Sequence, residues 1–291
     1  MHLPRIMVLS GGGVKAVAHI GALKTLDAAG TLAAVRTWVG LSAGALIAFG
    51  ICLGYSLAAL HDICDRFDFA ALQDPAPEGF LSFLDNYGID TGERLSRFVQ
   101  ALLTIRGHSA DLTFAGLAAT GAPTLRIVAT DMVTGSPLIY SAATTPDERL
   151  VDGLRASMSL PFYFWPVRGP TGNMLVDGGV HGLYPINLLS VEERVHALGI
   201  MLTQELGQWT DSSGPDAYIL RLYEIASAAK NELVAQAHAS QTIRVITPKI
   251  SMVEFTLTAE QRTKLYQSGV RGATAYLARL RGARWRRRHS H

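Results

Sequence analysis

The sequence contains little cysteine. Its two cysteines, Cys52 and Cys64, lie in or beside apolar segments and have no metal-ligand spacing. Two thiols cannot build a disulfide framework, so we expect both to be reduced core residues. Residues 1–10 also lack the apolar region and the cleavage site of a secretory signal, so we expect a cytoplasmic protein.

Charged residues are also scarce and unevenly spread. They form 17% of the chain against 48% hydrophobic residues, which excludes wholesale disorder and allows a large core. Six of the basic residues fall within residues 279–291, which hold no acid: Arg279, Arg281, Arg284, Arg286, Arg287 and Arg288. Without these six, 20 basic residues face 24 acidic ones, a balance of −4.

An acidic body with a basic end is not typical of a nucleic-acid enzyme, so we expect no nucleic-acid partner. We divide the chain into a domain of residues 1–278 and a basic tail of residues 279–291. The tail is either a frayed, solvated terminus or a peripheral contact with an anionic membrane surface. Near such a surface each arginine contributes about 1 kcal/mol.

The segment from Trp38 to Leu60 contains no charged residue and is long enough to cross a bilayer. However, glycines and serines interrupt it, and it begins with a strand-like run. A helix buried inside an α/β domain has the same composition, and we favour that interpretation.

The order of the apolar runs predicts an α/β fold. Strand, glycine turn and helix follow one another twice in the first sixty residues, with strands at 5–9 and 37–41 and helices ending near 30 and 53. Further strands are expected at 125–129, 138–140, 174–176, 195–202 and 244–246. Further helices are expected at 56–67, 91–105, 150–158 and 216–239, and a last helix follows a Thr258–Gln261 capping box. This order predicts three layers, α/β/α, with a mainly parallel central sheet.

Aromatic and apolar residues cluster around a Pro/Gly loop at 74–79. We interpret them as ordinary core side chains; the alternative is a cap over an apolar pocket. They are Phe67, Phe69, Phe80, Phe83, Leu84 and Tyr87.

The motif Gly40-Leu41-Ser42-Ala43-Gly44 lies between a strand and a helix, as a nucleophile elbow does. Gly40 and Gly44 leave room for the sharp turn, which forces the serine into a strained backbone conformation. The Ser42 hydroxyl would then stand at a helix N-terminus, where backbone N–H groups favour negative charge. The alternative is a small-residue turn with a helix-capping serine.

Two other turns that follow strands contain groups that could take part in catalysis. Gly11, Gly12 and Gly13 can direct backbone N–H groups toward a developing oxyanion. Asp177 follows an apolar strand, and Gly178 and Gly179 leave its carboxylate accessible. Because the carboxyl ends of parallel strands share one edge of the sheet, we expect all three turns to meet there.

A serine nucleophile needs a base. His181, His196 and His238 each permit the order Ser, Asp, His, but none lies in a glycine-opened turn after a strand, and only two strands precede Ser42. Asp177 can act directly if apolar neighbours raise its pKa. From these residues alone, both the triad and the direct aspartate base stay open.

These motifs together resemble those of the patatin-like phospholipases. The matching segments are Gly11-Gly12-Gly13-Val14-Lys15, Gly40-Leu41-Ser42-Ala43-Gly44 and Asp177-Gly178-Gly179, and the similarity covers about residues 5–202. The resemblance implies a Ser42–Asp177 dyad with no histidine base, no metal and no cofactor, and hydrolysis of lipid acyl esters. It departs at Ala16, where the family usually has glycine, and at residues 181–185.

Lys15 either holds the glycine turn or orients a lipid phosphate. Two other classes of protein remain as alternatives. Gly11, Gly13 and Ala16 also fit a dinucleotide-binding fingerprint, but the second strand does not end in the acid that would bind a ribose, and the nearest acid, Asp27, lies on the helix. A non-catalytic lipid-binding protein on the same fold would not need Ser42, Asp177 and the glycine donors together.

Overall fold

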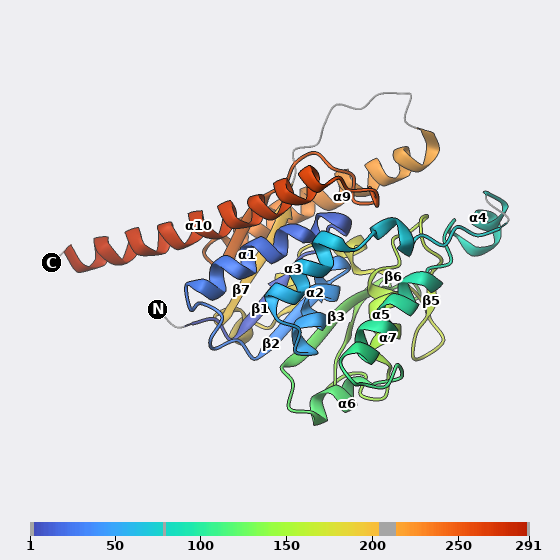
Figure 1. Cartoon of the computed structure of the whole chain (residues 1–291), viewed down its shortest axis with the longest axis horizontal. Helices are drawn as coiled ribbons and strands as arrows, with labels where there is room; N and C mark the ends of the chain where they lie inside the picture. The colour runs from blue at the N-terminus through green and yellow to red at the C-terminus, as the bar shows by residue number, and fades with distance from the viewer. Residues whose placement is uncertain (1–2, 78–79, 204–213, 290–291) are drawn as a thin grey trace.

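The computed structural model describes residues 3–77, 80–203 and 214–289 (Figure 1). The strands are β1 (Ile6–Leu9), β2 (Thr37–Leu41), β3 (Thr124–Asp131), β4 (Ser136–Tyr140), β5 (Val167–Arg168), β6 (Met174–Asp177), β7 (Ala197–Thr203) and β8 (Thr242–Ile246). The α-helices are α1 (Val17–Ala28), α2 (Ala43–Cys52), α3 (Leu57–Arg66), α4 (Phe80–Asn86), α5 (Glu93–Ile105), α6 (Phe114–Ala119), α7 (Leu150–Ser157), α8 (Val191–Arg194), α9 (Gly214–Ala237) and α10 (Ala259–His289). Short 3-10 turns are η1 (Gly13–Ala16), η2 (Phe69–Leu72), η3 (Gly178–His181), η4 (Pro185–Leu188) and η5 (Ala239–Gln241).

The strands form one mixed sheet in the order β5-β6-β3-β2-β1-β7-β8, with β4 paired to β3. β3, β2, β1, β7 and β8 are parallel neighbours, and β4 and β6 run antiparallel to β3. The predicted fold class, with its mainly parallel central sheet, is therefore confirmed.

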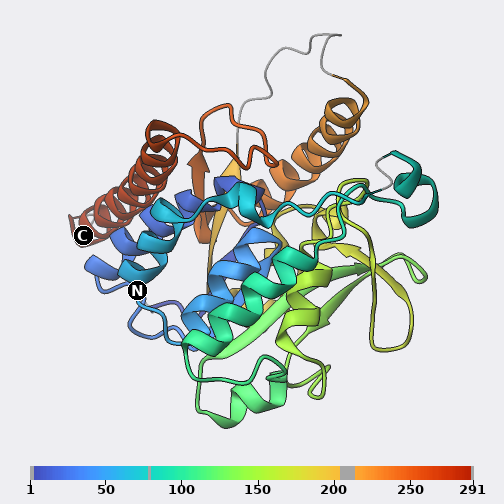
Figure 2. The ribbon, with the colours of Figure 1, turned by 45° about the vertical axis from the view of Figure 1, so that its right-hand side comes forward.

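Both faces of the sheet are buried, because alternate residues of each strand point to opposite faces. Met7 and Leu9 of β1 enter the larger core, which α1, α2, α7 and α10 cover. Ile6 and Val8 enter a second core on the other face, beneath η4 and part of α9. Figures 1 and 2 show this layering, with α1, α2 and α10 together on one side of the sheet.

β2 and β6 meet head-on beside β3. β4 occupies one edge of β3, so β2 and β6 share the other edge. In this register Leu41 of β2 lies opposite Val128, and Asp177 of β6 lies opposite the next residue, Ala129. We predicted that Asp177 would follow a parallel strand, and this is wrong, because β6 runs antiparallel to β3. Asp177 still ends its strand next to the carboxyl end of β2, because β6 runs toward β2 along β3.

The segment around α4 differs from the prediction. Phe67 and Phe69 pack in a small core with Leu95 and Phe164, as expected. Leu84 and Tyr87, in contrast, are exposed. The reason is that α4, for which no helix was predicted, projects away from the body of the molecule (Figure 1).

α10 is the longest helix described. Thr258 and Gln261 form the predicted reciprocal bonds at its start: Thr258 N–H to Gln261 Oε1 at 2.8 Å and Gln261 N–H to Thr258 Oγ1 at 3.1 Å. The helix continues through residue 279 to His289, so the proposed domain boundary after residue 278 falls inside it and stays a prediction. Among the described residues, no helix has the length and apolar character needed to span a bilayer.

Candidate active site

Ser42 occupies the sharp turn between β2 and α2. Its backbone has φ 52° and ψ −128°, a conformation that residues with side chains rarely adopt. Gly44 permits this turn, because a Cβ there would lie 2.4 Å from the Ser10 carbonyl oxygen. The Ser42 side chain does not cap α2, so the alternative of a helix-capping serine is not what the structure shows. This is the geometry of a nucleophile elbow.

The elbow is held by Ser157 at the end of α7. The Ser42 N–H donates to Ser157 Oγ at 2.8 Å, and the Ser157 hydroxyl donates to the Val128 carbonyl at 2.6 Å. Ser157 is fully buried. It therefore links the strained residue to the strand beside which β2 and β6 meet.

Asp177 lies next to Ser42 at the end of β6. The Ser42 hydroxyl lies beside its carboxylate and favours the ionised form, and the Gly179 N–H donates to Oδ1 at 2.7 Å. Burial raises the pKa of Asp177 from its usual value to about 6, although hydrogen bonds from Ser42, Gly179 and Tyr223 oppose the shift. A buried carboxyl with that pKa can exchange a proton near neutral pH.

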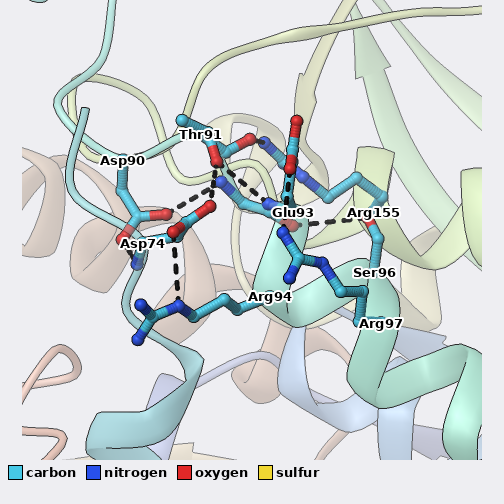
Figure 3. A network of polar contacts seen from close by, with 9 residues as sticks. Asp74, Asp90, Thr91, Glu93, Arg94, Ser96, Arg97 and Arg155 are labelled. Atoms are coloured by element: carbon cyan, nitrogen blue, oxygen red, sulfur yellow. Dashed lines mark hydrogen bonds and ion pairs between the residues drawn. The ribbon is translucent and has the colours of Figure 1, made fainter. Parts of the chain in front are cut away.

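A buried arginine supports Asp177 from the other side. The backbone N–H of Asp177 donates to the Ser159 carbonyl at 2.8 Å, and Arg155 Nη1 donates to Ser159 Oγ at 2.6 Å. Arg155 Nη2 also donates to the carbonyls of Thr91 and Trp165, at 2.8 and 2.9 Å. Figure 3 shows Arg155 of α7 next to Thr91, which lies just before α5.

The glycine turn supplies fewer oxyanion donors than predicted. The Gly11 N–H already donates to the Leu183 carbonyl at 2.9 Å, so Gly11 is not available as a donor. Gly12 and Gly13 line the cavity that contains Ser42, and within the described residues neither N–H has a protein acceptor. The turn is closely covered, since a Cβ on Gly13 would lie 2.0 Å from the Met252 carbonyl oxygen.

Ser42 and Asp177 open into one apolar cavity. Its volume is about 880 Å³, counting the part that is open to solvent. Most of its wall is apolar and includes Leu46, Leu95, Met158, Leu160, Phe164 and Phe255. A cavity with this lining suits an apolar ligand with one reactive polar group.

None of the three candidate histidines lines this cavity. His181 lies in a separate depression with Gly178 and Lys230, where burial lowers its pKa. His196 borders a surface depression beside Arg5, and His238 precedes η5. In the described part of the chain, the structure therefore brings Asp177 to Ser42 and leaves these imidazoles elsewhere.

Lys15 points away from the reactive groups. It lines a second, more polar pocket on the far side of the glycine turn, where its Nζ lies 3.9 Å from Glu224 Oε1. Burial lowers the pKa of Lys15 to about 8, and the Glu224 carboxylate partly offsets this. Of its two predicted roles, this position favours support of the glycine turn.

Two residues of the site were missed by the sequence analysis. Tyr223 of α9 lines the cavity, and its hydroxyl donates to Asp177 Oδ1 at 3.5 Å. His19 of α1 is fully buried, and its Nε2 donates to the Ser10 carbonyl at 2.8 Å, just before the glycine turn. Neither lies in a recognisable motif, because each is defined by a contact between elements distant in sequence.

Comparison with known proteins agrees with this geometry. The sequence profile described as patatin-like phospholipase matches residues 7–190, which include Ser42, Asp177 and the glycine turn. The chain therefore belongs to the patatin-like phospholipase family, and it is a hydrolase of lipid esters.

The similarity extends to individual proteins. YqhO of Bacillus subtilis (strain 168) is 26% identical over 294 residues, covering 93% of this chain and 97% of YqhO. A probable lipid hydrolase, 463L of Invertebrate iridescent virus 6, is 24% identical over 186 residues, covering 63% of this chain and 62% of 463L. The crystal structure of VipD from Legionella pneumophila superposes with a TM-score of 0.65 at 18% identity, over 95% of this chain and 67% of VipD. This last likeness concerns the fold.

Proposed function

We propose that this chain is a serine acyl hydrolase of the phospholipase A or lysophospholipase type, in which Ser42 and Asp177 act as a dyad. Ser42 Oγ attacks the ester carbonyl and its proton passes to the Asp177 carboxylate. The N–H groups of Gly12 and Gly13 stabilise the oxyanion. The alcohol then leaves with the proton from Asp177, and water hydrolyses the acyl-enzyme by the same path.

The observation that carries this proposal is the placement of the Ser42 hydroxyl beside a fully buried carboxylate in one apolar cavity. An aspartate with an ordinary pKa is a weak base at neutral pH. Burial of Asp177 brings its pKa closer to the working pH, which makes proton transfer from a hydroxyl less unfavourable. The apolar wall holds the acyl chain, so the ester carbonyl can lie between Ser42 Oγ and the glycine turn.

The test uses a fluorogenic long-chain ester and a fluorophosphonate label. We expect wild-type protein to hydrolyse the ester and to be labelled on Ser42, whereas Ser42→Ala abolishes both. Asp177→Asn should reduce hydrolysis at least about a thousandfold, as loss of a catalytic base does. His181→Ala is the matched control and should retain activity. Loss of activity in His181→Ala would instead support the Ser-Asp-His esterase, and an inactive, unlabelled wild type would support the lipid-binding protein.

The same cavity suggests how the protein meets its substrate. Four large side chains are exposed on and just after α4 and in the loop at Phe162, and we call them the apolar rim: Leu81 (65%), Leu84 (62%), Tyr87 (57%) and Phe162 (49%). The Phe83 ring of α4 stacks on the Phe162 ring, with centroids 5.9 Å apart. Phe162 lies between Leu160 and Phe164, which line the cavity. Tyr87 and Phe162 also hold left-handed backbone conformations, with φ of 59° and 68°. Strained, exposed aromatic residues beside a site are typical of a binding surface.

The rim fits a neutral lipid surface. Residues 80–90 and 160–166 contain no basic side chain, and their two acidic residues are Asp85 and the buried Asp90. The arginine-bearing end of α10 lies at the opposite end of the molecule from α4 (Figure 1). The tail therefore cannot serve the same contact with a membrane as the rim, and we propose that the rim docks on a zwitterionic surface.

Co-sedimentation with phosphatidylcholine vesicles tests this docking without turnover, in the Ser42→Ala background. We expect binding that is insensitive to salt and is lost when Leu84 and Phe162 are replaced by serine. Serine at Val191 and Ile246, which are equally exposed elsewhere, is the control. Binding that survives the rim changes but disappears when Arg286, Arg287 and Arg288 are replaced by glutamine would assign docking to the tail.

A further inference from the structure

One face of α9 contacts the loop that follows β6. The Tyr223 hydroxyl donates to Asp177 Oδ1 at 3.5 Å, and the Ser227 hydroxyl donates to the Gly179 carbonyl at 3.4 Å. One turn further along, Asn231 Oδ1 accepts the Tyr184 N–H at 3.2 Å. The spacing of four residues places these three side chains on the same face of the helix.

α9 lies outside the part of the chain that matches the family profile, which ends at residue 190. Its contact with Asp177 is therefore a feature that the family motifs do not assign. In Figure 2, α9 lies on the side of the sheet away from α1 and α2, so it reaches the carboxyl from the other side than the nucleophile helix does.

The Tyr223 hydroxyl is enclosed next to the carboxylate. A Cβ at position 179 would lie 2.0 Å from Tyr223 Oη, so a glycine is needed there for the hydroxyl to approach. The polar groups that face the Asp177 carboxylate are the Ser42 hydroxyl from the elbow, the Gly179 N–H from its own loop and the Tyr223 hydroxyl from α9. No charged side chain of the described residues is among them.

We propose that Tyr223 is a positioning residue for the dyad. Its hydroxyl and the Gly179 N–H both bind Oδ1 of Asp177, and together they fix the rotation of the carboxylate toward Ser42. This inference rests on the proposed function, because it assigns Tyr223 to the same base.

Burial and the nearby Asp177 carboxylate raise the pKa of Tyr223 well above its usual value. The phenol therefore remains a donor throughout the pH range in which Asp177 titrates. A donor that stays protonated stabilises the carboxylate form over the neutral acid.

The direct test is a carbon-13 NMR titration of labelled aspartate side chains, with Asp177→Asn to assign the resonance. In Tyr223→Phe the aromatic ring remains but the donor is lost. We expect the pKa of Asp177 to rise by about half to one pH unit, the equivalent of one modest hydrogen bond. Tyr55→Phe is the matched control, since the Tyr55 hydroxyl donates to the Leu102 carbonyl at 2.8 Å and does not line the cavity. An unchanged Asp177 titration in Tyr223→Phe would overturn the inference.

This measurement needs no turnover, so its outcome is separate from that of the proposed function. If the wild type hydrolyses esters, the acidic limb of its kcat/KM profile should move upward by the same shift in Tyr223→Phe. If the wild type is inactive and unlabelled, the proposed dyad chemistry fails, and the titration still decides whether Tyr223 controls the carboxyl.

Gly179→Ala gives a second, independent test. The added methyl group displaces the Tyr223 hydroxyl, so we expect the substitution to raise the pKa of Asp177 in the wild type and to raise it much less in the Tyr223→Phe background. Such coupling is the mark of two groups in direct contact. Equal shifts in the two backgrounds would show that the glycine does not serve the tyrosine hydroxyl.

Discussion

Asp177→Asn should make the protein more stable while abolishing its activity. Burial raises the pKa of this carboxyl from 3.8 to about 6 in the folded state. The folded protein thus holds a proton on Asp177 that the unfolded chain has already lost. The contribution of Asp177 to stability is fully present below pH 3.8 and is lost as the pH rises through about 6. A difference of about two pKa units corresponds to about 3 kcal/mol of unfolding free energy at pH 8.

An asparagine avoids this cost because it carries no charge, and its Oδ1 still accepts the Gly179 N–H. Urea denaturation of wild type and Asp177→Asn between pH 4 and pH 8 measures the effect. The variant should gain up to about 3 kcal/mol over wild type at pH 8, and this gain should disappear toward pH 4. Asp85→Asn on exposed α4 reports the effect of removing one surface charge. A stability difference that does not change with pH would show that the Asp177 carboxyl titrates normally and would refute the argument for a buried base.

Two further changes test the elbow. Ser157→Ala leaves the Ser42 N–H and the Val128 carbonyl without partners, so we expect a loss of about 2–4 kcal/mol in urea unfolding; a loss below about 1 kcal/mol would mean that the elbow does not depend on Ser157. Gly44→Ala places a methyl group 2.4 Å from the Ser10 carbonyl oxygen and should cost about 2–3 kcal/mol. Gly30→Ala, with φ of 70° and no atom within 4 Å of the added carbon, should cost about 1 kcal/mol. A loss in Gly44→Ala no larger than that in Gly30→Ala would show that the close approach to Ser10 does not require a glycine at position 44.

The parts of the site that depend on neighbouring residues could be predicted from the sequence. The elbow follows from small residues between a strand and a helix, and its strained serine is confirmed by a φ of 52°. The α/β architecture likewise follows from local periodicity. The proximity of Asp177 was also predicted, but through a parallel strand that is in fact antiparallel.

The remaining features depend on contacts that no local pattern encodes. The Gly11 N–H donates to the carbonyl of Leu183, a residue far along the chain, so it is not available to an oxyanion. Tyr223 reaches Asp177 from a helix whose own periodicity says nothing about the carboxyl. Leu84 and Tyr87 are residue types that are usually found in a core. They are exposed because α4 extends away from the body of the molecule, which the sequence does not indicate.

Because β2 and β6 pair end to end with the same edge of β3, the backbone of β3 fixes the spacing between Ser42 and Asp177. β3 itself contributes no side chain to the proposed chemistry. Two consecutive backbone positions, Val128 and Ala129, set the separation of hydroxyl and carboxyl. A slip of one residue between β6 and β3 would carry the acid about 3.3 Å along the strand and turn it to the opposite face. An insertion in the loop between β5 and β6 therefore preserves the position of Asp177 only if the pairing of β6 with β3 is kept.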